Sequence, residues 1–282
     1  MSEGERVNNL VVISDTHCGC AMGLMHPAGV TLDDGGTYTP SDFQRGIWEW
    51  WVEFWRWVQD KTKGEPYDVV FNGDALQGKP HSAIHQVSDN WDVQLRVAYK
   101  CLEEPRRAAR RYYHIRGTEA HGGKSLQYEE ILARELGAEP TEQGLYARYE
   151  LNKLIGRSEQ GILVNCMHHV GTTGRQHYES TAVLGELVEA YVEAGRWHDR
   201  APDCVVRSHR HRNLEVKIPT ANSWGVSVVT PGWQGRTPFA AKIAGARQSQ
   251  PQFGGVLIRE APDGVWYSMP WVRSLSRGEP EV

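Results

Sequence analysis

The chain has 282 residues, of which 40% are hydrophobic and 23% charged, with a formal net charge of −4. This length and composition are those of an ordinary globular protein with one large domain or two small ones. The mild negative charge argues against tight nucleic-acid binding by charge alone, although a local basic groove remains compatible with it. The sequence lacks an apolar run of about 18 residues and a secretory signal, so we expect a cytoplasmic protein without a membrane segment.

The five cysteines form an odd and scattered set. Cys18 and Cys20 are too close for an ordinary zinc knuckle, and no second pair complements them, so a structural zinc site is poorly supported. We expect reduced, structural thiols. Cys18 directly follows His17, so it either lines a site or fills space. The other three are Cys101, Cys166 and Cys204.

The first half of the sequence alternates predicted strands and helices. Residues 10–14 form a continuous β-branched run typical of a buried strand, and a polar loop follows over about 18–41. Residues 47–58 predict a tryptophan-rich helix with two apolar faces. This helix is either buried on two sides, or it forms a homo-oligomer interface or an aromatic wall near a site.

The alternation continues with predicted strands over 67–72 and 112–116 and helices over about 90–111 and 126–136. Four arginines gather at the end of the first of these helices. They suit either a solvated helix end that complements the macrodipole or a phosphate-binding role. These residues are Arg106, Arg107, Arg110 and Arg111.

The second half is richer in strands than in helices. This order favours one α/β domain over residues 1–282, built on two packed sheets, with tails over about 1–8 and 273–282. One helix is expected over 181–194. Strands are expected over 145–151, 161–167, 204–207, 214–218, 225–229 and 255–259.

Side chains that bind metals follow five of the apolar runs. Polar groups gathered at strand ends are how α/β sheets build sites, and imidazole and carboxylate are usual ligands of borderline divalent metals. Five such stretches suggest a site for two metal ions. They are Asp15-Thr16-His17, Gly73-Asp74, the segment from Gly117 to His121, His168-His169 and His209-Arg210-His211.

Spacing within two of these stretches points to shared metals. Asp15 and His17 are two residues apart, and in an extended segment such residues point the same way. Both side chains are therefore expected to reach one metal. His209 and His211 repeat this spacing after a later strand.

Asp74 and His168 are single candidates at the ends of their strands. A carboxylate has two oxygens, so Asp74 can bridge two cations, and Gly73 before it lets backbone approach the ligands closely. His168 and His169 point in opposite directions if the strand continues, so only one is expected to be a ligand. We favour His168.

Taken in order, these motifs resemble the calcineurin-like metallophosphoesterase superfamily, whose pattern is Asp-x-His, Gly-Asp, Gly-Asn-His-Asp/Glu, His, then Gly-His-x-His. The resemblance implies an α/β fold, a four-layer α/β/β/α sandwich of two mixed sheets. It also implies two divalent metal ions, for which oxygen and nitrogen ligands suit Mn²⁺, Fe or Zn²⁺. In this pattern Asp15, His17 and His211 hold one metal, His168 and His209 hold the other, and Asp74 bridges them.

The chain departs from the family pattern in two places. Ser208 stands where the family has Gly before the His-x-His pair. In the third motif Thr118 occupies the position of the Asn that binds metal, and Glu119 that of the His that protonates the leaving group. We expect Thr118 or Glu119 to supply the missing oxygen ligand and His121 to take the acid role, with Glu119 as a second candidate catalytic group. The alternative is a weak or empty second metal site.

Residues 230–239 also look related to the site, because they follow a strand and mix an aromatic, an amide and an arginine. They resemble the C-terminal segment of phage and prophage members of the superfamily. Trp233 is expected to stack on a base and Arg236 to clamp a phosphate. Asn72, at the end of its strand, is a third candidate for substrate binding. The alternative is a surface turn.

The resemblance implies a metal-dependent phosphoesterase, a hydrolase. Two cations can stabilise both the attacking and the leaving oxygen of an in-line displacement. We favour a phosphodiesterase acting on nucleotides or nucleic acid. The alternatives are a phosphomonoesterase or protein phosphatase, and a non-catalytic binding protein on the same fold that uses the helix over 47–58 as its partner surface.

Overall fold

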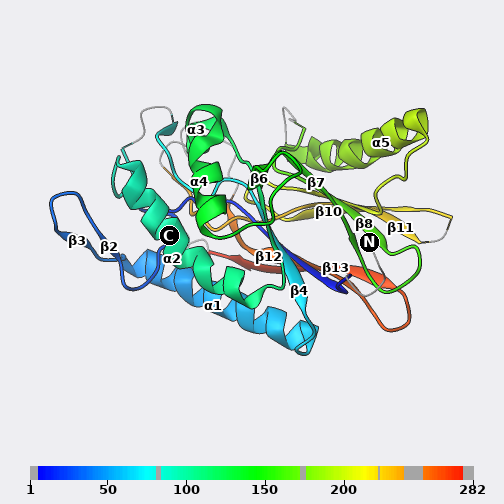
Figure 1. Ribbon diagram of the computed structural model, residues 1–282, viewed down its shortest axis with the longest axis horizontal. Helices are drawn as coiled ribbons and strands as arrows, with labels where there is room; N and C mark the ends of the chain where they lie inside the picture. Colours follow the sequence, from blue (N-terminus) through cyan, green and yellow to red (C-terminus); the bar gives the residue numbers. More distant parts are fainter. Residues whose placement is uncertain (1–5, 81–83, 172–175, 222, 238–249, 276–282) are drawn as a thin grey trace, which may run out of the picture.

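The fold is two β-sheets packed face to face, with helices on both outer sides (Figure 1). The computed structural model describes residues 6–80, 84–171, 176–221, 223–237 and 250–275. Helices α1 and α2 lie on one side of the pair of sheets and α5 on the other (Figure 1). The predicted four-layer sandwich is therefore confirmed.

The first sheet has six strands in the order β13-β12-β1-β4-β5-β6. Strands β1, β4, β5 and β6 run parallel, whereas β12 and β13 are antiparallel additions, so the sheet is mixed. The parallel strands are β1 (Asn9–Ile13), β4 (Tyr67–Asn72), β5 (Tyr112–Ile115) and β6 (Ala147–Arg148), and the others are β12 (Gln252–Glu260) and β13 (Trp266–Ser274).

The second sheet has five strands in the order β10-β11-β9-β8-β7 and is also mixed. Its centre is parallel, from β11 through β9 to β8, and both edges are antiparallel. The strands are β7 (Glu150–Ile155), β8 (Ile162–Met167), β9 (Cys204–Arg207), β10 (Leu214–Pro219) and β11 (Trp224–Val229). A small hairpin of β2 (Val30–Thr31) and β3 (Thr37–Tyr38) lies in the predicted polar loop.

Three long helices belong to the first sheet and one to the second. None of the described helices combines the length and apolar character that a bilayer-spanning segment needs. The long helices are α1 (Asp42–Thr62), α2 (Trp91–Ala108), α4 (Gln127–Glu135) and α5 (Glu179–Trp197). The short ones are α3 (Glu119–Gly122), η3 (Lys124–Leu126) and η4 (Gln176–Tyr178).

Strand β1 shows how the sequence builds the layers. Leu10 and Val12 pack into the core between the two sheets. Val11 and Ile13 pack into the core between the first sheet and its helices. Successive side chains of a strand point to opposite faces, so a strand covered on both faces needs a continuous apolar run. This is why β1 was recognisable from sequence.

The chain ends differ from the expectation. Strand β13 was not predicted, and it contains Pro270. It is an edge strand of the sheet, where proline is tolerated because one side of the strand has no partner strand to bond. The predicted C-terminal tail therefore begins inside β13. At the other end Val7 and Asn8 are already buried. A single domain over the whole chain remains a prediction.

The tryptophan-rich helix packs within its own chain. Ser41 caps α1 through a capping box with Gln44. Trp51 is buried, and the other tryptophans of this helix are partly buried against the same core. Packing on two sides thus accounts for both apolar faces, and an oligomer through residues 47–58 remains a prediction. The partly buried ones are Trp48, Trp50, Trp55 and Trp57.

Trp233 corrects one expectation directly. Its side chain is fully buried, with 0% exposure. It packs edge-on against Trp51, with ring centroids 4.8 Å apart, and lies beside Phe54 and Trp271. The prediction that Trp233 stacks on a substrate base is wrong, because burial of this large apolar ring in the core leaves no face for a ligand.

We predict that Trp233→Ala lowers the free energy of unfolding by about 3–5 kcal/mol, since it removes a large buried side chain. Trp197→Ala is the control, because Trp197 is 72% exposed and should change stability by less than about 0.5 kcal/mol. Urea denaturation of both variants measures the difference. Equal effects would contradict the core position of Trp233.

Candidate metal centre

The candidate ligands gather where parallel strands of both sheets end. Backbone hydrogen bonds tie the ligand loops to one another: Asp15 N–H donates to the Gly73 carbonyl at 2.9 Å, and His17 N–H to the Asp74 carbonyl at 3.1 Å. In the second sheet, Ser208 N–H donates to the His168 carbonyl at 2.9 Å. The carboxyl ends of parallel strands form one edge, which explains why distant motifs meet.

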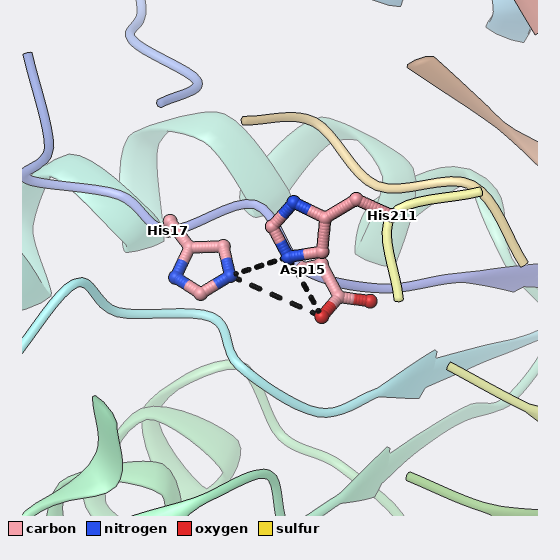
Figure 2. Close-up of side chains that lie close together, drawn as sticks. All are labelled: Asp15, His17 and His211. Carbon is pink, nitrogen blue, oxygen red and sulfur yellow. Dashed lines mark hydrogen bonds and ion pairs between the residues drawn. The ribbon is translucent and has the colours of Figure 1, made fainter. Parts of the chain in front are cut away.

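Asp15, His17 and His211 form the first ligand group (Figure 2). The His17 and His211 Nε2 atoms lie 3.0 Å apart. Asp15 Oδ1 lies 3.3 Å from His211 Nε2 and 3.9 Å from His17 Nε2. Ligand atoms bound to one tetrahedral ion at zinc-like bond lengths lie about 3.4 Å apart. The three atoms therefore already have the spacing that a common cation requires.

Asp74, His168 and His209 form the second group. Asp74 Oδ2 lies 3.0 Å from His168 Nε2 and 3.8 Å from His209 Nδ1. His168 Nδ1 donates to the Asn72 carbonyl at 2.7 Å, which fixes the ring with Nε2 toward Asp74. His169 is exposed and lies outside the groups found among the described residues. This agrees with the choice of His168.

Asp74 also belongs to a third group, with His17 and His121. A ligand atom of Asp74 thus lies within 4.8 Å of one from His17, a member of the first group, so Asp74 connects the first and second groups, as a bridging carboxylate must. The pairing of His211 with Asp15 and of His209 with Asp74 matches the division that the family resemblance implied. These positions agree with the predicted ligand sets, whereas metal binding itself remains a prediction.

The backbone at the ligands differs from the extended geometry that we assumed. Asp15, His17, Asp74, His209 and His211 all have positive φ angles, between 43° and 73°. Such left-handed conformations are uncommon outside glycine and cluster at functional sites, where the surrounding structure holds them. The i, i+2 spacing thus brings Asp15 and His17 together through tight loops, and it sends the His209 and His211 side chains to different groups.

Glycines next to the ligands are required by close approach. A Cβ at Gly117 would lie 2.1 Å from Asp74 Oδ1. At Gly73, which has a φ of +89°, a Cβ would lie 2.5 Å from His168 Nδ1. Any side chain at either position would displace a ligand. This explains the two glycines that precede the second and third motifs.

The altered third motif lies beside Asp74. Thr118 N–H and Thr118 Oγ1–H both donate to Asp74 Oδ1, at 2.6 and 3.0 Å. Thr118 therefore contacts a ligand, and its role as a ligand itself remains a prediction. Glu119 is not brought to the centre, because at the first position of α3 it is exposed and outside the three groups. The expectation that Glu119 supplies a metal ligand or a catalytic group is not supported.

His121 does reach the centre. Its Nδ1 donates to the Gln77 carbonyl at 2.6 Å, and its ring lies edge-on to His17 with centroids 4.4 Å apart. The Gln77 contact fixes the tautomer and leaves Nε2 as the reactive nitrogen. This position is compatible with the predicted acid role and also with metal ligation.

Burial and neighbouring charges set the ionisation of the ligands. Burial would raise the pKa of Asp15, but His211 and His168 together outweigh it and hold that pKa below its ordinary value. The same competition, with His168 as the main partner, lowers the pKa of Asp74. Burial, reinforced by His121 and His211, lowers the pKa of His17 and keeps its imidazole neutral. Ionised carboxylate and neutral imidazole are the forms that bind metals.

The residues fit a divalent cation on independent grounds. Asp15 Oδ1 and His168 Nε2 are buried, and within the described residues their near polar neighbours are other candidate ligands, His211 Nε2 at 3.3 Å and Asp74 Oδ2 at 3.0 Å, without well-formed hydrogen bonds. Such groups are costly in a folded protein unless something satisfies them. Asp15 Oδ2, in contrast, accepts from Ser14 Oγ at 2.5 Å. One oxygen is thus held by the protein, and the other is left facing the histidines.

Asn72 holds the two sheets together and does not face a substrate. It is fully buried, and its Nδ2 donates to the Met167 carbonyl at 2.9 Å and to Ser208 Oγ at 2.6 Å. The prediction that Asn72 binds substrate is therefore wrong. Ser208, which replaces the glycine of the family pattern, also has its Oγ 2.7 Å from Thr230 Oγ1. Its hydroxyl therefore links Asn72, at the end of β4, to Thr230, just after β11.

Arg236 lies beside the centre, in a cavity of about 210 Å³ that His209 and His211 also line. The role of Arg236 as a phosphate clamp remains a prediction. Of the predicted arginine cluster, Arg106 donates to the Leu136 carbonyl and Arg110 pairs with Asp68. These contacts favour a structural role for that cluster. Cys18 is buried in the core between the first sheet and its helices.

Sequence reasoning missed a buried support behind Asp74. Glu129 Oε1 accepts from Ala75 N–H at 3.0 Å, while its other oxygen contacts His114 Nε2. His114 Nδ1 in turn lies 3.2 Å from the Tyr112 hydroxyl. All three side chains are buried. A signal existed, because Glu129 shares the apolar face of its predicted helix with Leu132 and Ala133.

Neither the protein-family models nor the curated proteins include a match to this chain. Solved structures similar to it include Chaetomium thermophilum Vps29 (9% identity, TM-score 0.38, covering 96% of this chain and 97% of that one). A metallophosphoesterase from Sphaerobacter thermophilus matches at 12% identity with a TM-score of 0.39, over 95% and 88% of the two chains. A predicted phosphoesterase from Streptococcus pneumoniae matches at 9% and 0.33, over 94% and 98%. All three TM-scores lie below 0.5, so the function of this chain rests on its own side chains.

We predict that Glu129→Ala weakens Mn²⁺ binding by about 10- to 100-fold, as expected when a residue that orients a metal ligand is lost. The Ala75 N–H would lose its acceptor, and the loop that carries Asp74 would relax. Calorimetric titration of the folded variant measures the change. Glu135→Ala, on the exposed face of the same helix, is the control, and equal affinities in the two variants would contradict the support role.

We predict that metal affinity falls as pH falls. Burial lowers the pKa of His168, but Asp74, with help from Asp15 and the Asn72 carbonyl, outweighs burial and raises the pKa to about 10. His168 is therefore protonated below that pH until a metal displaces the proton, and affinity should drop by about tenfold per pH unit. Titrations in buffers of different ionisation enthalpy detect the released proton. An affinity independent of pH would contradict this coupling.

Proposed function

We propose that this chain is a phosphoesterase that uses two divalent metal ions to hydrolyse a phosphate ester. The observation that carries the proposal is that Asp74 belongs to two ligand groups, one with His168 and His209 and one with His17 and His121, and His17 also belongs to the group of Asp15 and His211. Two neighbouring cations, when bound, polarise the phosphoryl oxygens and supply a nucleophilic water near neutral pH. The family resemblance of the five motifs supports the same activity.

The side chains of the centre have separate proposed roles as metal ligands and as a proton donor. Asp15, His17 and His211 would hold one ion and His168 and His209 the other, with Asp74 available to both. His121 is the proton donor to the leaving oxygen, because its Nδ1 is engaged by the Gln77 carbonyl and its Nε2 is left for the substrate. The mixed oxygen and nitrogen donors suit Mn²⁺, Fe or Zn²⁺.

As a finer proposal, the substrate is a phosphodiester of a nucleotide or nucleic acid. Arg236 beside His209 and His211 supports this, since guanidinium groups bind phosphate oxygens in pairs. A phosphomonoesterase or protein phosphatase is the alternative within the same chemistry. Kinship with phage and prophage members, a cytoplasmic location and a homo-oligomer through residues 47–58 remain predictions.

A non-catalytic binding protein is the second candidate function. It is favoured by the altered third motif, where Glu119 lies away from the centre, and by His209, whose side chain is 46% exposed. Metal content separates the two functions: about two ions per chain supports the enzyme, whereas none supports the binding protein.

We predict that the protein with Mn²⁺ hydrolyses bis-p-nitrophenyl phosphate and that Asp74→Ala abolishes this activity and lowers the metal content. The loss follows from removal of the shared ligand. Asp199→Ala, an exposed position, should leave both unchanged. The enzyme proposal fails if neither this diester nor p-nitrophenyl phosphate is turned over with Mn²⁺, Fe²⁺ or Zn²⁺.

We predict that His121→Ala lowers kcat by about 10²- to 10⁴-fold for a dinucleotide while the metal content is retained. The loss should be smaller for bis-p-nitrophenyl phosphate, because p-nitrophenolate leaves without protonation. The exposed His198 provides the control, as His198→Ala. If His121→Ala instead empties a metal site, His121 is a ligand and not the acid.

A further inference from the structure

An arginine-rich cavity continues outward from the metal centre. It has a volume of about 210 Å³, and His209 and His211 form part of its wall. Arg210, Arg212 and Arg236 line it as well, and no acidic residue is among its lining residues in the described part of the chain. A cavity whose described lining residues include three arginines and no aspartate or glutamate is suited to an anion.

The protein itself satisfies these guanidinium groups only in part. Arg210 contacts the Gly171 carbonyl through Nη2, while its Nη1 is buried without a partner. Arg212 makes one contact of 3.3 Å, from Nη1 to Glu179. Within the described residues Arg236 forms no ion pair. Arg212 and Arg236 therefore keep donors for a ligand, and planar guanidinium forks match phosphate oxygens.

The scissile phosphate does not account for all three arginines. In the proposed reaction the charge of that phosphate would already be neutralised by the two metal ions that the ligand groups would hold. The cavity lies to one side, sharing only His209 and His211 with those groups. An anion in the cavity would thus be a neighbour of the reacting group.

Gln77 contacts both the proposed acid, His121, and a residue of the cavity wall, Gln234. Gln77 accepts from His121 Nδ1 through its backbone carbonyl, and its side-chain oxygen accepts from Gln234 Nε2 at 2.7 Å. Gln234 lines the cavity and is 7% exposed. A group seated in the cavity would therefore have a fixed position relative to His121.

We propose that this cavity binds a second phosphate of the substrate, so that the preferred substrate carries a further phosphate next to the scissile one. The inference rests on the proposed phosphoesterase function. Two sources share this chemistry: the next phosphate along a nucleic-acid strand, and the next phosphate of a phosphoanhydride in a nucleotide.

Steady-state kinetics with matched substrates test the proposal. We expect KM for thymidylyl-thymidine to fall by about tenfold when a terminal phosphate is added at one end, which corresponds to about 1.4 kcal/mol. A nucleoside triphosphate is the arm for the anhydride source, compared with its nucleoside monophosphate. The arm with the larger preference identifies the source.

The double variant Arg212→Gln/Arg236→Gln should bring the ratio of KM values within each pair close to one. The matched control is Arg107→Gln/Arg196→Gln, in which both arginines are exposed, lie on α2 and α5 and do not line the cavity; it should keep the ratio. No preference in either pair, or a preference that survives in Arg212→Gln/Arg236→Gln, overturns the inference while turnover of bis-p-nitrophenyl phosphate upholds the proposed function.

Binding of inorganic pyrophosphate to the metal-free protein gives a readout that needs no catalysis. Calorimetric titration should detect binding to the wild type and at least tenfold weaker binding to Arg212→Gln/Arg236→Gln. If bis-p-nitrophenyl phosphate is not hydrolysed, this titration still tests whether the cavity binds phosphate. Equal binding by the two proteins, or none by the wild type, overturns the proposed phosphate seat.

Discussion

The burial of two carboxylates, Asp15 and Asp74, between the ends of the two sheets is the constraint on which the rest of the site depends. An ionised carboxylate away from water is strongly disfavoured unless positive charge or hydrogen-bond donors compensate it. Here the compensation comes from His211 and His168 and from donors such as Thr118. The tight loops and adjacent glycines exist because these groups must meet within a few ångströms.

The centre also joins the two halves of the fold. Asp15, His17 and Asp74 follow strands of the first sheet, whereas His168 and the His209–His211 loop follow strands of the second. A cation held by both sheets binds the folded chain and not the unfolded one. Metal binding would therefore stabilise the packing of one sheet on the other by mass action.

Most of the fold and the candidate ligands could be predicted from the sequence, but little of the surroundings of those ligands could. Strand β1 was readable because burial on both faces demands a continuous apolar run, and the ligands because they follow such runs. The prediction for Trp233 was wrong because a Pro-Gly-Trp segment is typical of an exposed turn, whereas the Trp233 ring packs on Trp51. Glu129 was missed because its partner Ala75 is 54 positions away and contributes only a backbone N–H.

The left-handed backbone at five of the ligands restricts which residues each position can accept. Asparagine, aspartate and histidine tolerate positive φ far better than β-branched or bulky residues. An exchange of ligand type at Asp15 or Asp74 would thus be filtered first by backbone conformation and only then by metal preference. The set of residues open to evolution or design at this centre is small before any chemistry is considered, and it already coincides with the common ligands of divalent metals.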